Sequence, residues 1–157
     1  MSRRSEQPCF PAQPGDPAPL MAATTRRVRF EEVDPLGIVW HGRYPSYLED
    51  GRSAFGDRHG LAYLDMAANR YLGPIVSMHL DYHSPLQFGE EMRIETTAHW
   101  SEAVKLLFSY RILGPDGRLA CTGHTVQLLL ALDRRLLLAF PEHLEAFRQR
   151  WRKGELK

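Results

Sequence analysis

The sequence lacks the features of several protein classes at once. No apolar run approaches the ~18 residues that a membrane-spanning helix needs, and the basic N-terminus carries no apolar segment of a secretory signal. The two cysteines, Cys9 and Cys121, are too few for a disulfide framework, so we expect two free thiols and a cytoplasmic location. A formal net charge of +1 favours neither nucleic-acid binding nor membrane-surface binding.

What the chain does contain is an ordinary globular composition, with 43% hydrophobic and 25% charged residues in a length of 157. This length corresponds to one domain that can bury a core without disulfides or metal. Residues 1–22 are rich in proline and show no hydrophobic period, so we expect a disordered N-terminal tail before a single domain over residues 23–152. Met21 is a second candidate start of translation, which mass spectrometry of the native protein would test.

One long helix is predicted over residues 44–59, after a first strand over residues 25–33. Apolar residues recur there at helical spacing, Pro45 fits the first turn, and Gly60 is a stop signal. Gly51 and Gly56 each lower the helix propensity by roughly 1 kcal/mol relative to alanine. We expect such glycines where another backbone passes close to the helix.

The second half of the chain alternates with period two, as strands do. Four strands are expected over residues 76–82, 92–100, 104–112 and 119–132, after a short irregular or helical piece over residues 61–70. Pro141 then opens a C-terminal helix. The order predicts an α+β fold with an antiparallel sheet.

The stretch from residue 29 to residue 44 carries the most chemical information. Asp34 follows the first strand and precedes a Pro-x-Gly turn, and a helix begins near His41. The first amides of a helix have no partner within it and can stabilise a developing oxyanion. An acid held near such amides can attack a polarised carbonyl, directly or through water. Taken alone, an aspartate at this place is more often a turn former than a catalyst.

Residues 34–41, with Tyr44, Glu49 and Arg52 beyond them, resemble the signature of the 4-hydroxybenzoyl-CoA thioesterase family. A second similarity covers residues 73–77 and 81–96, and the whole resemblance spans residues 26–145. It implies a hotdog fold, in which a curved antiparallel sheet wraps around a central helix. It also implies homodimers or homotetramers with active sites at the dimer interface, and an enzyme that hydrolyses acyl-CoA to free acid and CoA.

By the same resemblance, Asp34 is the catalytic carboxylate, as nucleophile or as general base for water. The backbone N–H of His41 polarises the thioester carbonyl, and Gly37 lets the loop turn tightly beside the ligand. The expected substrate-binding residues are Tyr44, Trp40, Glu49, Arg43 and Lys105. Simpler roles stay open for several of them, since Tyr44 suits a core position, Glu49 a pairing with Arg52, and the two cations a solvated surface.

The acyl group is expected to be aromatic, of benzoyl or hydroxybenzoyl type, or short. A binding protein without turnover and a hotdog dehydratase or hydratase are the alternatives, although the His-Phe-Pro-Gly-like segment of the latter is absent from the sequence. No cofactor is expected besides the CoA of the substrate. No metal site is expected, since His79 and His83 stand roughly 13 Å apart along a strand at ~3.3 Å per residue.

Overall fold

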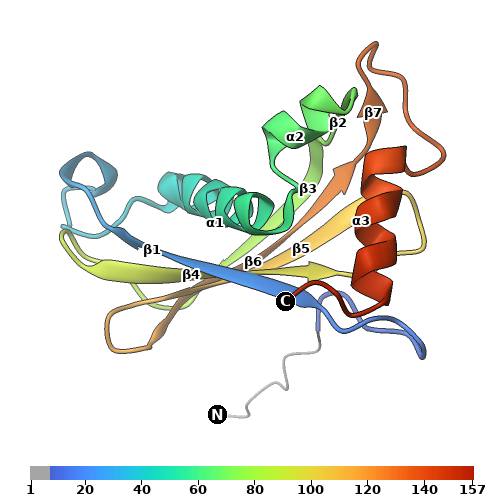
Figure 1. The fold of residues 1–157 in the computed structure, drawn as a ribbon. Helices are drawn as coiled ribbons and strands as arrows, with labels where there is room; N and C mark the ends of the chain where they lie inside the picture. The colour runs from blue at the N-terminus through green and yellow to red at the C-terminus, as the bar shows by residue number, and fades with distance from the viewer. Residues whose placement is uncertain (1–7) are drawn as a thin grey trace.

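The computed structural model describes residues 8–157, in which one curved antiparallel sheet wraps around a central helix, α1 (Tyr44–His59) (Figure 1). The strand order in the sheet is β1-β4-β5-β6-β3, and every neighbouring pair is antiparallel. The strands are β1 (Leu20–Arg27), β3 (Ile75–Tyr82), β4 (Glu91–His99), β5 (Lys105–Leu113) and β6 (Leu119–Leu128). This is the α+β arrangement that the sequence predicts.

Smaller elements close the two ends of the sheet. At one end, β2 (Tyr71–Leu72) pairs with β7 (Leu130–Ala131) beside α2 (Tyr63–Ala68), and α3 (Glu142–Arg152) packs nearby (Figure 1). At the other end, two 3-10 turns, η1 (Phe30–Glu32) and η2 (His41–Arg43), lead from β1 into α1. The predicted strand over residues 119–132 is therefore too long, because the chain leaves the large sheet after Leu128 and pairs elsewhere.

The first strand begins earlier than predicted and ends earlier. Leu20 and Ala22 are buried and pair with β4, so β1 begins inside the segment that the sequence assigned to the tail. After β1 the chain turns into η1, because the Glu32 carboxylate accepts the Arg29 N–H at 2.8 Å. Residues 1–7 of the predicted tail lie outside the described residues. Further along it, the Phe10 ring lies 5.4 Å from the ring of His99.

The helix α1 has the predicted bounds, and Gly60 ends it with a φ of +73°. A Cβ atom on Gly51 would overlap Oγ1 of Thr96 and lie 2.7 Å from Cγ2 of Ile94 on β4. A Cβ atom on Gly56 would lie 2.7 Å from the Cα atom of Ala62. The expected close approach of another backbone is confirmed at Gly56, whereas at Gly51 side chains of β4 occupy the space.

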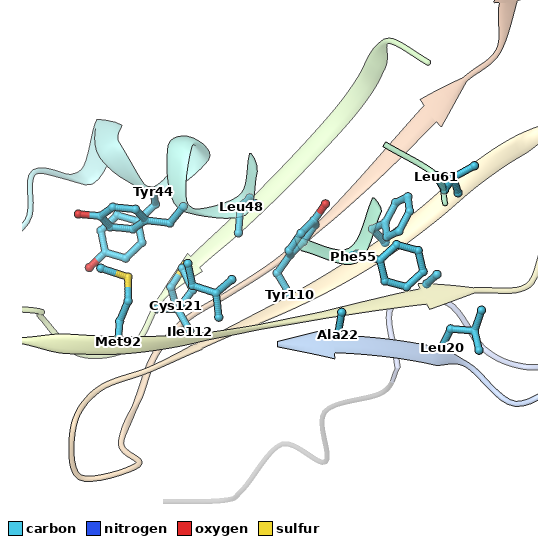
Figure 2. Packing of buried hydrophobic residues seen from close by; sticks show 14 of the residues in the cluster. Leu20, Ala22, Tyr44, Leu48, Phe55, Leu61, Met92, Tyr110, Ile112 and Cys121 are labelled. Atoms are coloured by element: carbon cyan, nitrogen blue, oxygen red, sulfur yellow. The ribbon is translucent and has the colours of Figure 1, made fainter. Parts of the chain in front are cut away.

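The core lies between α1 and the concave face of the sheet. Figure 2 shows Tyr44, Leu48 and Phe55 of α1 pointing toward side chains of the sheet, among them Met92, Tyr110, Ile112 and Cys121. Cys121 is buried and Cys9 exposed, and both are free thiols. None of the helices among residues 8–157 has both the length and the apolar character of a membrane-spanning helix.

A charged side chain, Arg52 of α1, is also buried in this core, with 1% of its surface exposed. Its Nε donates to Gln127 at 3.0 Å and its Nη1 to the carbonyl of Leu61 at 3.0 Å. Its guanidinium lies 4.6 Å from the centre of the Phe108 ring. Burial lowers the pKa of Arg52. Arg52 thus links α1 by hydrogen bonds to β6 and to the segment just before α2.

Candidate active site

Asp34 lies at the start of a tight turn between two short paired segments. Its N–H donates to the carbonyl of Ile38 at 2.9 Å, and Gly37 donates to the carbonyl of Asp34 at 2.9 Å. One carboxylate oxygen, Oδ1, accepts the N–H of Leu36 at 2.8 Å. The turn holds the carboxyl group by one oxygen, and the other oxygen has no hydrogen-bond partner among residues 8–157.

The Asp34 turn is tied to the loop of residues 83–90, which connects β3 to β4. Val39 donates to the carbonyl of Leu86 at 2.8 Å, and Phe88 donates to the carbonyl of Gly37 at 3.4 Å. Figure 1 shows both segments at the end of the sheet where α1 begins. Backbone hydrogen bonds on two sides therefore fix the position of Asp34 relative to the sheet.

The backbone amides of His41 and Gly42, in the 3-10 turn directly before α1, have no intrahelical acceptor. The first hydrogen bond of η2 runs from the Arg43 N–H to the Trp40 carbonyl at 2.9 Å. The amides of His41 and Gly42 come before this bond and are available to a ligand. The hydroxyl of Tyr82 donates to the carbonyl of His41 at 2.8 Å, so β3 holds the His41 peptide in place.

A cavity of about 340 Å³ brings the acid and this peptide together. Its lining comes from the Asp34 turn, from the start of α1 and from the end of β3 with the loop after it. The lining residues are Asp34, Ile38, Val39, His41, Tyr44, Tyr82, His83, Ser84 and Pro85. Apolar walls around one carboxylate and a helix N-terminus suit a ligand with a polarised carbonyl.

Burial sets the protonation of two groups next to this cavity. It raises the pKa of Tyr44 to about 12, so the Tyr44 hydroxyl stays protonated near neutral pH. It also raises the pKa of Cys121 to about 12, which keeps that thiol from acting as a nucleophile. Asp34, His41 and His83 are the other groups at this cavity that can accept a proton.

Of the residues expected in the site, Asp34, His41 and Tyr44 line one cavity. Gly37 has a φ of +77° in the turn, and a Cβ atom there would meet nothing within 4 Å, so its glycine serves backbone conformation. Trp40 is 49% exposed, with its ring 5.1 Å from the ring of His41. Arg43 is exposed, and its Nη2 donates to the carbonyl of Glu31 at 2.9 Å.

Two expected site residues, Glu49 and Lys105, lie away from Asp34. Glu49 lines a second cavity of about 540 Å³ at the β2 and β7 end of the sheet, with Tyr63, Leu72, Gly73, Pro74, Ile75, Leu130 and Arg134. The Tyr63 hydroxyl donates to Oε2 of Glu49 at 3.1 Å. Lys105 opens β5 opposite Leu128, at that same end. Within one chain, neither side chain reaches the cavity of Asp34.

Sequence reasoning missed the contribution of β3 to the cavity. Tyr82, His83, Ser84 and Pro85 fall within the second stretch of family similarity, residues 81–96, but none of them was expected in the site. The alternation of β3 does place Tyr82 on the same face as Leu80, which packs against the core. The signal in the sequence was a tyrosine at the end of the inward-facing alternation of β3, where the strand reaches the cavity.

Comparison with known proteins places this geometry in a family. The model of the thioesterase-like superfamily matches residues 28–147. YneP of Bacillus subtilis (strain 168), named as a candidate acyl-CoA thioesterase, is 34% identical over 93 residues, which cover 59% of this chain and 67% of that protein. A hypothetical protein of Thermus thermophilus has a TM-score of 0.75 at 30% identity, over 84% of this chain and 98% of that one.

A further solved structure, a hypothetical protein of Staphylococcus aureus in complex with CoA, has a TM-score of 0.75 at 21% identity and covers 85% of each chain. At that identity the likeness bears on the fold alone. Together these matches confirm the predicted hotdog fold and the predicted enzyme class, a thioester hydrolase. The match to the family model extends over most of the chain, which therefore belongs to the thioesterase-like superfamily.

Proposed function

We propose that this protein hydrolyses an acyl-CoA thioester, with Asp34 as the catalytic carboxylate and the backbone amide of His41 as the group that polarises the carbonyl. The observation that carries the proposal is the shared cavity of Asp34 and His41, at a helix start whose first amides lack intrahelical acceptors. An amide aimed at a developing oxyanion is worth ~10²–10³-fold in rate. The name of YneP supports CoA esters as the substrate class.

Two chemical routes fit the same arrangement. In the first, a carboxylate oxygen of Asp34 attacks the carbonyl carbon, the C–S bond breaks, the CoA thiolate leaves, and water hydrolyses the mixed anhydride. In the second, Asp34 takes a proton from water, the resulting hydroxide attacks the carbonyl, and the thiolate leaves with that proton. Both routes use one free carboxylate oxygen, which the Asp34 turn provides.

A second copy of the chain would complete the site. Within the described residues β3 pairs with β6 on one side, and its outer edge is open. Val76, Met78 and Tyr82 on this strand are 55%, 37% and 51% exposed. Open edges with apolar side chains favour pairing with another strand. Homodimers paired through β3, alone or within homotetramers, are therefore part of the proposal.

Antiparallel pairing of β3 with its own copy sets the start of one strand against the end of the other. Ile75, at the start of β3, belongs to the cavity of Glu49, and Tyr82, at its end, belongs to the cavity of Asp34. The pairing would bring the partner subunit's Glu49 toward Asp34, and the partner subunit's Lys105 to the same side. The expected binding roles of both residues thus depend on the dimer.

The test is a screen of aryl and short aliphatic CoA esters with detection of the free thiol. For Asp34→Asn we expect a loss of ~10²-fold or more in kcat, and for the exposed helix residue Asp57→Asn no loss. His41→Ala keeps the backbone amide and should retain most of the activity. Full activity of Asp34→Asn would refute the mechanism, and CoA binding without any turnover would favour a non-catalytic binding protein. The screen also shows whether the acyl group is aromatic or short.

A further inference from the structure

Two exposed phenylalanines beside the Asp34 turn have no part in the reaction described above. Phe30 in η1 is 77% exposed, and Phe88 in the loop of residues 83–90 is 58% exposed. Their rings meet edge to face, with 5.9 Å between the centres. Large apolar side chains gathered on a surface mark an interaction site more often than isolated ones do.

This aromatic pair is fixed relative to the catalytic turn. The N–H of Phe88 donates to the carbonyl of Gly37 at 3.4 Å, and Gln87 bridges to Ile38. Phe30 begins the 3-10 turn that Glu32 closes through the Arg29 N–H. A ligand that occupies the cavity of Asp34 and extends outward over this loop would reach both rings.

Three arginines surround the pair. Nη1 of Arg27 donates to the carbonyl of Gly89 at 2.9 Å, next to Phe88, and Nη2 of Arg43 donates to the carbonyl of Glu31 at 2.9 Å, next to Phe30. Arg29 directly precedes Phe30, and its side chain is 66% exposed. Within residues 8–157, neither Arg27 nor Arg43 pairs with a carboxylate.

Each guanidinium carries several donors, and a single carbonyl bond leaves most of them free for phosphate oxygens. Two exposed acids belong to this group: Glu31, whose carboxylate lies 3.9 Å from Nη1 of Arg29, and Glu91, which stands opposite Arg27 where β1 pairs with β4. Three cations against these two carboxylates leave the rim one net positive charge. Such a rim is complementary to a polyanion bound at short range.

We propose that the Phe30–Phe88 pair and Arg27, Arg29 and Arg43 bind the 3′-phosphorylated ADP end of CoA. The adenine packs on the phenyl rings, and the arginines bind the 3′-phosphate and the diphosphate. Because the rings meet at 86°, a flat base stacks on one ring and contacts the other from the side, whereas a stable protein partner needs ~800 Å² on each side. The inference rests on the proposed function for the identity of the substrate, but nucleotide binding is testable without turnover.

The first experiment compares two substrates that share an acyl group, an acyl-CoA and the matching acyl-N-acetylcysteamine thioester, which has no nucleotide. For Phe88→Ala and Arg29→Glu we expect the ratio of kcat/KM for the CoA ester to kcat/KM for the short ester to fall about tenfold each, or ~1.4 kcal/mol. Phe88→Tyr, which keeps a ring, should restore the ratio. Leu138→Ala and Arg150→Glu, on other exposed surfaces, are the matched controls and should leave the ratio unchanged.

The second experiment measures the Kd of adenosine 3′,5′-bisphosphate by calorimetry on the wild type and the same variants. We expect weaker binding by a similar factor in Phe88→Ala and Arg29→Glu. An unchanged ratio and an unchanged Kd would overturn the nucleotide site, even if the enzyme hydrolyses CoA esters well. If the wild type cleaves neither thioester, the proposed function fails, and the Kd values alone decide the nucleotide site.

Discussion

Replacing Gly51 of α1 by alanine has two opposite effects on stability, a gain in helix propensity and a loss in packing. In an unobstructed helix interior, alanine is favoured over glycine by ~1 kcal/mol. At Gly51, however, the new Cβ would overlap Oγ1 of Thr96 and lie 2.7 Å from Cγ2 of Ile94. Both neighbours are completely buried, so they have no free space into which to move.

The packing term is the larger of the two. Inserting a methyl group into a filled core costs ~1–3 kcal/mol. Moving Thr96 breaks no hydrogen bond, because its Oγ1 has no partner among the described residues, so the packing cost is steric alone. We therefore expect Gly51→Ala to lower the free energy of unfolding by about 1 kcal/mol, after subtraction of the propensity gain. For a domain of this size, that corresponds to a fall in Tm of ~2–4 °C.

The assay is urea denaturation at one fixed protein concentration, since association changes the apparent stability. Ser53, exposed on the same helix, supplies the control. The difference in free energy of unfolding between Ser53→Gly and Ser53→Ala gives the helix-propensity term alone. Subtracting this term from the effect of Gly51→Ala gives the packing term. If Gly51→Ala raises the midpoint by as much as that control difference, the close approach of α1 to β4 does not constrain the fold.

Two further predictions concern the site and the response to pH. Tyr82→Phe removes the hydroxyl that donates to the His41 carbonyl at 2.8 Å. We therefore expect kcat to fall ~2–10-fold, with little change in KM. An unchanged kcat would show that this hydrogen bond does not position the His41 peptide. Burial lowers the pKa of His59 below its ordinary 6.5. As the pH falls through this range, the unfolded chain therefore binds a proton that the folded chain does not. The free energy of unfolding is thus expected to fall from about pH 7 toward pH 5. Denaturation midpoints across this range should fall less steeply for His59→Gln, and equal slopes would contradict this.

The parts of the fold that the sequence predicted are those with strong local signals. The helix α1 combines an apolar stripe with a proline near its start and a glycine at its end. The start of β1 was missed because its inward-facing Ala22 is small and gives little contrast with Ala23. The break between β6 and β7 was missed because residues 128–132 are uniformly apolar, and pairing with β2 decides where the strand ends.

The candidate site divides in the same way. Asp34 and His41 were selected by the resemblance to the 4-hydroxybenzoyl-CoA thioesterase family, and the structure places both at one cavity. Tyr82 reaches the same cavity through the pairing of β3 with β6, which no local pattern reports. Glu49 was selected through the family resemblance and Lys105 as a cation for phosphate, and the geometry of one chain places both at the other end of the sheet.

The bonds from the Asp34 turn to residues 83–90 also bear on how this protein can be altered. Exposed connections between strands ordinarily accept insertions and exchange of residues. Here Leu86 and Phe88 carry the backbone atoms that hold Val39 and Gly37, so a change in loop length would displace the acid directly. Libraries that vary this loop should therefore keep its length and vary only its exposed side chains. Loop grafts between relatives should be transplanted together with the Asp34 turn, as one unit.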